Sequence, residues 1–132
     1  MARTLDLVAA AVAHGRTAGR VGIVGYCWGG YLAWLASGAV DGLAASIPYY
    51  GGGMPQHADV QPRCPVLAHF GETDGHIPVD GVNALQAAHP AIAVHLYPAG
   101  HGFNRDVTAA YDAPSARLAR ERTLALLRQH VG

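Results

Sequence analysis

The sequence contains no lysine: its nine basic residues are all arginine, and nine acidic residues match them. Without lysine, neither Schiff-base catalysis nor a phosphate-binding loop built around a lysine is possible. Because the formal net charge is zero, there is no positive field to hold a nucleic acid or an anionic membrane. We therefore expect neither as a partner.

Cysteine is also scarce. Cys27 and Cys64 are the only two, and neither belongs to a Cys-x-x-Cys pair, so a disulfide framework is excluded. This predicts a reduced, cytoplasmic setting. No apolar stretch approaches the ~20 residues that a membrane span requires. Asp6 interrupts the N-terminal apolar run, which predicts an amphipathic helix that stays on the protein, with its apolar side formed by Leu5, Val8, Ala9 and Val12.

The residues that are present favour a single α/β domain spanning all 132 positions. Hydrophobic residues make up 51% of the chain and charged residues only 14%, which suits strands buried on both faces. Helical and strand patterns alternate, so we predict a parallel sheet of about four strands with flanking helices and right-handed crossovers. The expected strands are 21–25, 44–50, 65–70 and 93–97, and the expected helices are 4–14, 31–37, 79–88 and a last one after Pro114. Residues 54–63 are predicted to form a surface loop.

The segment Gly25-Tyr26-Cys27-Trp28-Gly29 has the G-x-C-x-G pattern of a nucleophile elbow, in the version that carries cysteine. The turn is tight, so both flanking glycines are expected where a Cβ atom would collide with a neighbouring strand or helix. The elbow should place the Cys27 sulfur at a helix N-terminus, where the dipole stabilises a thiolate. The Trp28 N–H can then donate to an oxyanion. The alternative is an inert structural cysteine beside a glycine-rich turn.

Asp74 and His101 complete a candidate triad. Each follows a predicted strand, and the carboxyl ends of parallel strands meet at one rim of the sheet, where Cys27 should also lie. A carboxylate at Asp74 can fix the tautomer of an imidazole, although the residue could instead cap a helix or a turn, and Glu72 is a second candidate. His101 lies between two glycines that let its loop bend toward the elbow, although a loop histidine can also be simply solvated.

The remaining histidines show no paired ligand spacing, so we expect no metal site. Cys64 precedes a strand and is interpreted as a packed or half-exposed thiol. The C-terminal arginines are interpreted as the solvated face of the last helix.

With these motifs, the sequence resembles the dienelactone hydrolase (carboxymethylenebutenolidase) family of α/β-hydrolases. The resemblance runs from the first helix to the last and is carried by residues 25–30, 49–51, 71–78 and 101–105, in the order nucleophile, acid, histidine. It implies opening of a lactone or ester without a cofactor. It also implies that Arg105 contacts a substrate carboxylate, with Tyr49 and Tyr50 as further substrate-binding residues. The alternative for Arg105 is an ion pair with Asp106 or Asp112.

The sequence departs from the family in length, since only 26 residues precede Cys27. About four strands ahead of the elbow have no counterpart here. In the family that part supplies a second oxyanion N–H, a glutamate beside the resting thiol and another arginine. Loss of one oxyanion donor costs roughly 10²–10³ in rate. A catalytically silent half-domain that acts as a binding or assembly module is therefore the alternative to a hydrolase, and a thiol redox sensor at Cys27 is a third, weaker one.

Assembly is the last expectation. Without the preceding strands, Val21–Gly25 becomes an apolar sheet edge with no charge or proline to protect it. We expect a homodimer that pairs these edges about a two-fold axis.

Overall fold

The computed structural model describes residues 1–132 and contains one sheet of four parallel strands. The strands are β1 (Val21–Tyr26), β2 (Leu43–Tyr49), β3 (Leu67–Gly71) and β4 (Ala93–Tyr97), in the spatial order β1-β2-β3-β4. The predicted parallel sheet is confirmed, with strand ends that differ from the expected ones by at most two residues. The position of β1 at an edge is confirmed as well.

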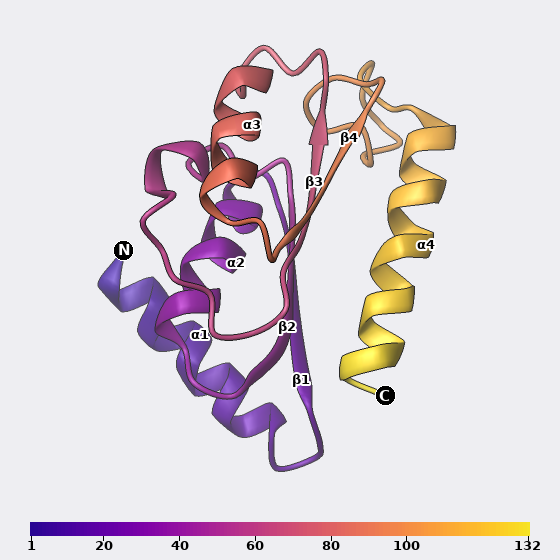
Figure 1. The fold of residues 1–132 in the computed structure, drawn as a ribbon. Helices are drawn as coiled ribbons and strands as arrows, with labels where there is room; N and C mark the ends of the chain where they lie inside the picture. The colour runs from indigo at the N-terminus through magenta and orange to yellow at the C-terminus, as the bar shows by residue number, and fades with distance from the viewer.

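Helices cover both faces of the sheet. α1 (Ala2–Gly15), α2 (Trp28–Ala39) and α3 (Val79–Ala88) lie on one side, and α4 (Ala113–His130) covers the other side alone (Figure 1). α2 begins three residues earlier than predicted, directly after Cys27. α4 begins before Pro114 rather than after it, because proline in the first turn lacks only an N–H that has no helical partner there.

α1 is the predicted amphipathic helix. Its Val12 is buried in one cluster with Ala36 of α2, Val40 directly after that helix and Leu43 of β2. Leu5, Val8 and Ala9 are partly buried against the same cluster, so the four apolar positions of the helix share one packed face. The helical spacing of these apolar residues in the sequence therefore predicted the packed face of α1 correctly.

The ladder between β2 and β3 is interrupted, and Pro48 explains the interruption. The Ser46 N–H donates to the Pro65 carbonyl at 2.9 Å, and the Tyr50 N–H donates to the His69 carbonyl at 2.7 Å. In a parallel strand, alternate residues direct their N–H groups to the same neighbour, so residue 48 also faces β3. Proline has no N–H to donate, which leaves a gap between the two bonds.

The prediction of a surface loop at residues 54–63 is wrong at Met54 and misses a short helix, although Gln56 and His57 are exposed as expected. Met54 is completely buried, and Pro55–His57 form a short 3₁₀ helix. The indole N–H of the buried Trp34 donates to the His57 carbonyl at 2.8 Å. Polar composition marked this segment as exposed, but the aromatic side chains of α2 hold it against the core.

A buried polar network lies between the sheet and α4. Both ring nitrogens of His69 are bonded, Nδ1 with the Tyr97 hydroxyl at 2.7 Å and Nε2 with the Thr123 hydroxyl at 2.9 Å. The Thr123 hydroxyl also contacts the Tyr49 hydroxyl at 2.9 Å, and Arg122 donates to the Tyr97 hydroxyl at 3.1 Å. His69 has no exposed surface, so the network satisfies polar groups that burial would otherwise penalise.

This network predicts that acid destabilises the fold through His69. Burial, followed by the charges of His95 and Arg122, lowers the pKa of His69 from 6.5 to about 3. The unfolded chain therefore binds a proton at a pH where the folded chain does not. The free energy of unfolding should fall as pH drops from 6.5 toward 3, with a slope from this group of up to about 1.4 kcal/mol per pH unit.

Urea unfolding at several pH values in that window checks this prediction. The matched variant is His69→Gln, which cannot titrate. The difference in unfolding free energy between wild type and variant should shrink on acidification, whereas two parallel curves would show that His69 is not the titrating group.

Candidate active site

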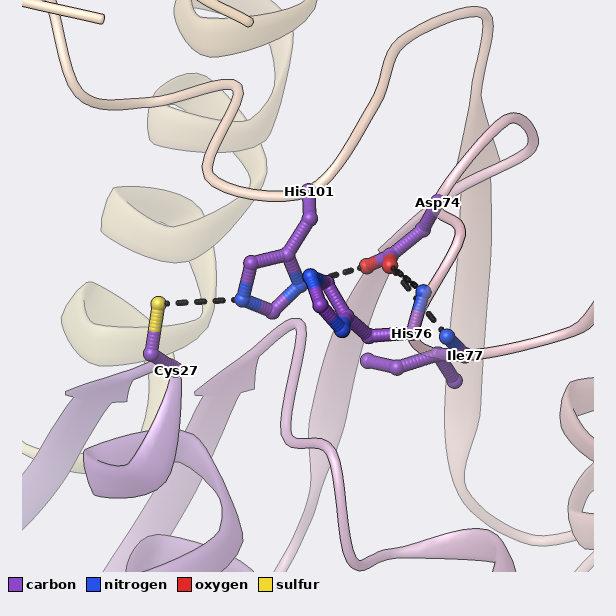
Figure 2. A network of polar contacts seen from close by, with 5 residues as sticks. All are labelled: Cys27, Asp74, His76, Ile77 and His101. Carbon is purple, nitrogen blue, oxygen red and sulfur yellow. Dashed lines mark hydrogen bonds and ion pairs between the residues drawn. The ribbon is translucent and has the colours of Figure 1, made fainter.

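Cys27, His101 and Asp74 come together at the carboxyl rim of the sheet, as predicted. Cys27 follows β1, Asp74 lies in the loop after β3, and His101 lies in the loop after β4. The His101 ring joins the other two, with Nε2 at 3.2 Å from Cys27 Sγ and Nδ1 at 2.6 Å from Asp74 Oδ2 (Figure 2). A continuous line of polar contacts therefore links a thiol, an imidazole and a carboxylate.

The backbone of the elbow is strained at Cys27, whose φ of 56° and ψ of −121° directly precede α2. A Cβ atom on Gly25 would lie 1.9 Å from the Gly29 carbonyl oxygen, so glycine is required there. The expectation for Gly29 is wrong, because a Cβ atom at that position meets nothing within 4 Å. The second position that needs glycine is Gly30, where a Cβ atom would lie 2.4 Å from the Tyr49 carbonyl oxygen.

Asp74 combines the two roles that the sequence left as alternatives. Its Oδ1 accepts the backbone N–H groups of His76 at 2.8 Å and Ile77 at 3.2 Å, which stabilises the turn. Its Oδ2 accepts His101 Nδ1, and the carboxylate has no exposed surface. Glu72, the second candidate, is exposed. The turn bonds therefore fix the carboxylate that orients the imidazole.

The pKa of Cys27 shifts in the direction opposite to the one expected from a helix N-terminus alone. Partial burial and the negative charge of Asp74 raise the pKa of the Cys27 thiol, and the positive charge of Arg105 offsets part of that rise. The helix N-terminus beside the sulfur favours a thiolate, and the Asp74 carboxylate across the rim opposes it. Burial and the Asp74 charge therefore favour the thiol over the thiolate at Cys27, and His101 Nε2 lies 3.2 Å from the sulfur.

A cavity of about 430 Å³ opens in front of the thiol, and we call it the Cys27 cavity. Its walls come from the ends of β1 and β2 and from the loop after His101. The lining residues are Tyr26, Cys27, Tyr50, Gly102, Asn104, Arg105 and Asp106.

Two of the three predicted substrate-binding residues lie on this cavity and one does not. Arg105 and Tyr50 line it, whereas Tyr49 is buried in the core with its hydroxyl on Thr123. Neither aspartate forms an ion pair with Arg105, and the Asp112 carboxylate accepts the Ser115 N–H at 3.0 Å as the cap of α4. The Arg105 guanidinium is therefore free to meet a ligand.

Trp28 is the first residue of α2, so its N–H lies beside the thiol without a helical acceptor. Its side chain is largely exposed. The amide position is the one that the sequence assigned to the oxyanion.

Sequence reasoning missed two neighbours of the site, Tyr26 and His76, and the strained backbone of Tyr50. Tyr26 lines the Cys27 cavity, and its position beside the nucleophile on an edge strand was an available signal. The His76 ring packs against the His101 ring in a T-shaped arrangement, with centroids 5.0 Å apart (Figure 2). Tyr50 has a φ of 37°, and Cys27 and Tyr50 are the only non-glycine residues with positive φ. The elbow motif predicts the strain at Cys27, but no sequence pattern indicates the strain at Tyr50, and both lie at the rim, as strained residues do at functional sites.

No group of three or more His, Cys, Asp and Glu side chains is placed to hold a metal ion. None of the helices has both the length and the apolar character that crossing a membrane requires.

Known proteins share this architecture. The model of the dienelactone hydrolase family matches residues 1–131. A carboxymethylenebutenolidase of Pseudomonas putida is 39% identical over 117 residues, which cover 83% of this chain and 48% of that protein. A carboxymethylenebutenolidase of Cupriavidus pinatubonensis is 35% identical, with 83% and 48% covered. A crystal structure from Klebsiella pneumoniae, assigned to the dienelactone hydrolases, aligns with a TM-score of 0.78 at 34% identity, covering 96% of this chain and 60% of the other.

The parallel sheet with an elbow at the end of its edge strand places this protein among the α/β-hydrolases. Within them, the chain belongs to the dienelactone hydrolase family. It spans about half the length of the curated relatives that it matches.

Proposed function

We propose that this chain hydrolyses a lactone or a carboxylic ester, with Cys27 as nucleophile, His101 as base and Asp74 as orienting acid. The observation that supports it best is the line of contacts from Asp74 through His101 to Cys27. Three loops that are distant in sequence contribute one residue each, which a structural cysteine does not require. Membership of a hydrolase family agrees with this chemistry.

In the first half of the proposed reaction, His101 Nε2 accepts the thiol proton while Cys27 Sγ attacks the substrate carbonyl carbon. The oxyanion that forms lies at the N-terminus of α2, where the Trp28 N–H can donate to it. When the intermediate collapses, the C–O bond breaks, and His101 returns the proton to the departing alkoxide. Asp74 Oδ2 stabilises the charged imidazole throughout.

In the second half, His101 accepts a proton from water, which attacks the thioester carbonyl. The carbonyl–sulfur bond breaks, the acid is released, and Cys27 recovers its proton from His101. The cycle is a hydrolysis with no redox step and no cofactor.

A turnover assay on the purified chain tests this proposal. Hydrolysis of p-nitrophenyl acetate should be measurable, and iodoacetamide should abolish it as one thiol is alkylated, identified as Cys27 by mass spectrometry. Retained turnover after alkylation of Cys27 would contradict the mechanism. A chain with an intact triad and no turnover would favour the silent half-domain.

Arg105 is proposed to bind a carboxylate on the substrate. It lines the Cys27 cavity, and its positive charge offsets part of the rise that burial and Asp74 cause in the pKa of the Cys27 thiol. The Arg105→Gln variant should lower kcat/KM for carboxylate-bearing lactones about tenfold more than for neutral esters, since one charge-assisted interaction is lost. Steady-state kinetics on both substrates measure the ratio, and equal losses would contradict the role.

We also propose that the chain forms a homodimer through β1. Its outer edge has no partner strand, and Val24 and Tyr26 are exposed there, at 37% and 47%. Two copies pairing β1 antiparallel about a two-fold axis would satisfy both edges and cover this apolar surface.

Light scattering and hydrogen exchange test the dimer. The expected result is the dimer mass at micromolar concentration, with slow exchange of those β1 amides that face away from β2. Val24→Lys at the edge should shift the protein to monomer. A wild-type monomer with freely exchanging edge amides would refute the dimer.

A further inference from the structure

A second hollow adjoins the Cys27 cavity on the side of α4, and we call it the α4 hollow. Its volume is about 380 Å³. It shares Asn104 and Asp106 with the Cys27 cavity, so the loop after His101 forms a wall common to both. The other lining residues are Tyr111, Ala113, Ala116, Arg117 and Arg120.

Two arginines give the α4 hollow a positive charge. Arg117 and Arg120 are three residues apart on α4 and therefore share a face of the helix. Both are exposed, and neither takes part in an ion pair, since the ion pairs of this structure are Arg63–Asp41 and His101–Asp74. The alanines of the same face leave space in front of the guanidinium groups.

The acidic groups near these arginines do not neutralise them. The Asp112 carboxylate accepts a hydrogen bond from the Ser115 N–H, and the first turn of α4 contains no acidic residue. Asp106 is the one carboxylate in the walls of the two hollows. Against it stand three guanidinium groups, those of Arg105, Arg117 and Arg120, so the joined space keeps an excess of positive charge.

We propose that Arg117 and Arg120 form an anion subsite that binds a carboxylate or phosphate group on a part of the substrate away from the reacting carbonyl. This inference rests on the proposed hydrolase function and narrows its substrate class. Arg105 serves an anionic group beside Cys27, and the α4 hollow serves a second one beyond the shared wall. The preferred substrate is then an ester or lactone with a negative charge at its far end.

Binding tests the subsite without any turnover. The Cys27→Ala protein is titrated with adipate and, separately, with inorganic phosphate, and backbone NMR shifts of Asn104 and Tyr111 report occupancy. The double variant Arg117→Gln/Arg120→Gln should bind at least one of them about tenfold more weakly, as expected for lost charge-assisted contacts. Arg128→Gln, a charge removed near the other end of α4, is the matched control and should bind as before. A response to adipate alone identifies a carboxylate, and a response to phosphate alone identifies a phosphate.

Asp106→Asn provides the opposite change. Removing the one carboxylate of the shared wall should tighten binding of the same probes several-fold, and added salt should weaken it. If the arginines had only a structural role, neither Asp106→Asn nor added salt would change the affinity for the probes. Equal affinity of both probes for the parent protein and the double variant overturns the subsite.

Turnover separates this inference from the proposed function. In the active protein, the double variant should lose about tenfold more kcat/KM on mono-p-nitrophenyl adipate than on p-nitrophenyl acetate. If the wild type hydrolyses neither ester but arginine-dependent binding remains, the hydrolase proposal fails and the anion subsite stands. If both esters are hydrolysed and the two losses are equal, the subsite is overturned while the hydrolase proposal stands.

Discussion

The Cys27→Ala variant is expected to lose ester hydrolysis, with kcat/KM lower by about 10⁴-fold or more. Alanine removes the sulfur that lies 3.2 Å from His101 Nε2, and no other cavity residue forms a hydrogen bond with that imidazole. Water attack at the same carbonyl would then have to proceed with the remaining site groups alone. The loss should appear in kcat, because the substrate is still held by the cavity.

Cys64→Ala is the matched control. Cys64 is half-buried and precedes β3, at the end of the sheet opposite to the rim that carries the triad. Its removal should leave turnover of p-nitrophenyl acetate within about two-fold of wild type, since surface and half-buried changes away from a site have small effects. Circular dichroism should show the same fold for both variants. Undiminished hydrolysis by Cys27→Ala would remove the proposed mechanism.

The Gly25→Ala variant is expected to be the most destabilising substitution of the elbow. Its Cβ atom would lie 1.9 Å from the carbonyl oxygen and 2.3 Å from the carbonyl carbon of Gly29, both backbone atoms that no side-chain rotation can move. Relief requires β1 and α2 to separate, and the two elements pack directly on each other. We expect a loss of about 3–5 kcal/mol in unfolding free energy, or failure to fold.

Gly29→Ala, in the same motif, provides the contrast. A Cβ atom at Gly29 meets nothing within 4 Å, and the residue lies in the first turn of α2. Alanine has a higher helix propensity than glycine, so stability should stay the same or rise by up to about 1 kcal/mol. Urea unfolding of the two variants measures the difference. Equal effects of both substitutions would contradict this account of the elbow.

The sequence was sufficient for the order of the elements and for the three residues that meet at the rim. Cys27, Asp74 and His101 each follow a strand, and the carboxyl ends of parallel strands share one rim, so no tertiary detail was needed to bring them together. The helix from Val79 to Ala88 and the strand from Ala93 to Tyr97 were predicted at their observed bounds, since periodicity and length mark both clearly.

Alternation alone could not decide which of two adjacent tyrosines reaches the cavity. Tyr49 points to α4 and joins the His69 network, while Tyr50, with its positive φ, lines the Cys27 cavity. Tyr50 is a single strained residue just after a strand end, and no pattern of composition or spacing marks its positive φ. The sequence also could not show that glycine is needed at Gly30 and not at Gly29, because this depends on how closely α2 approaches β2.

Sequence patterns determined what is local: the periodicity of helices and strands, the elbow motif and the chain order of the triad. Only the tertiary structure decided the direction in which the pKa of Cys27 shifts, because burial and the Asp74 carboxylate, which both raise it, depend on neighbours from other loops. The tertiary structure also decided the two hollows, whose shared wall and α4 face are separate in sequence. The charge and the shape of a site depend on residues that are close in space, and many of these residues are distant from one another along the chain.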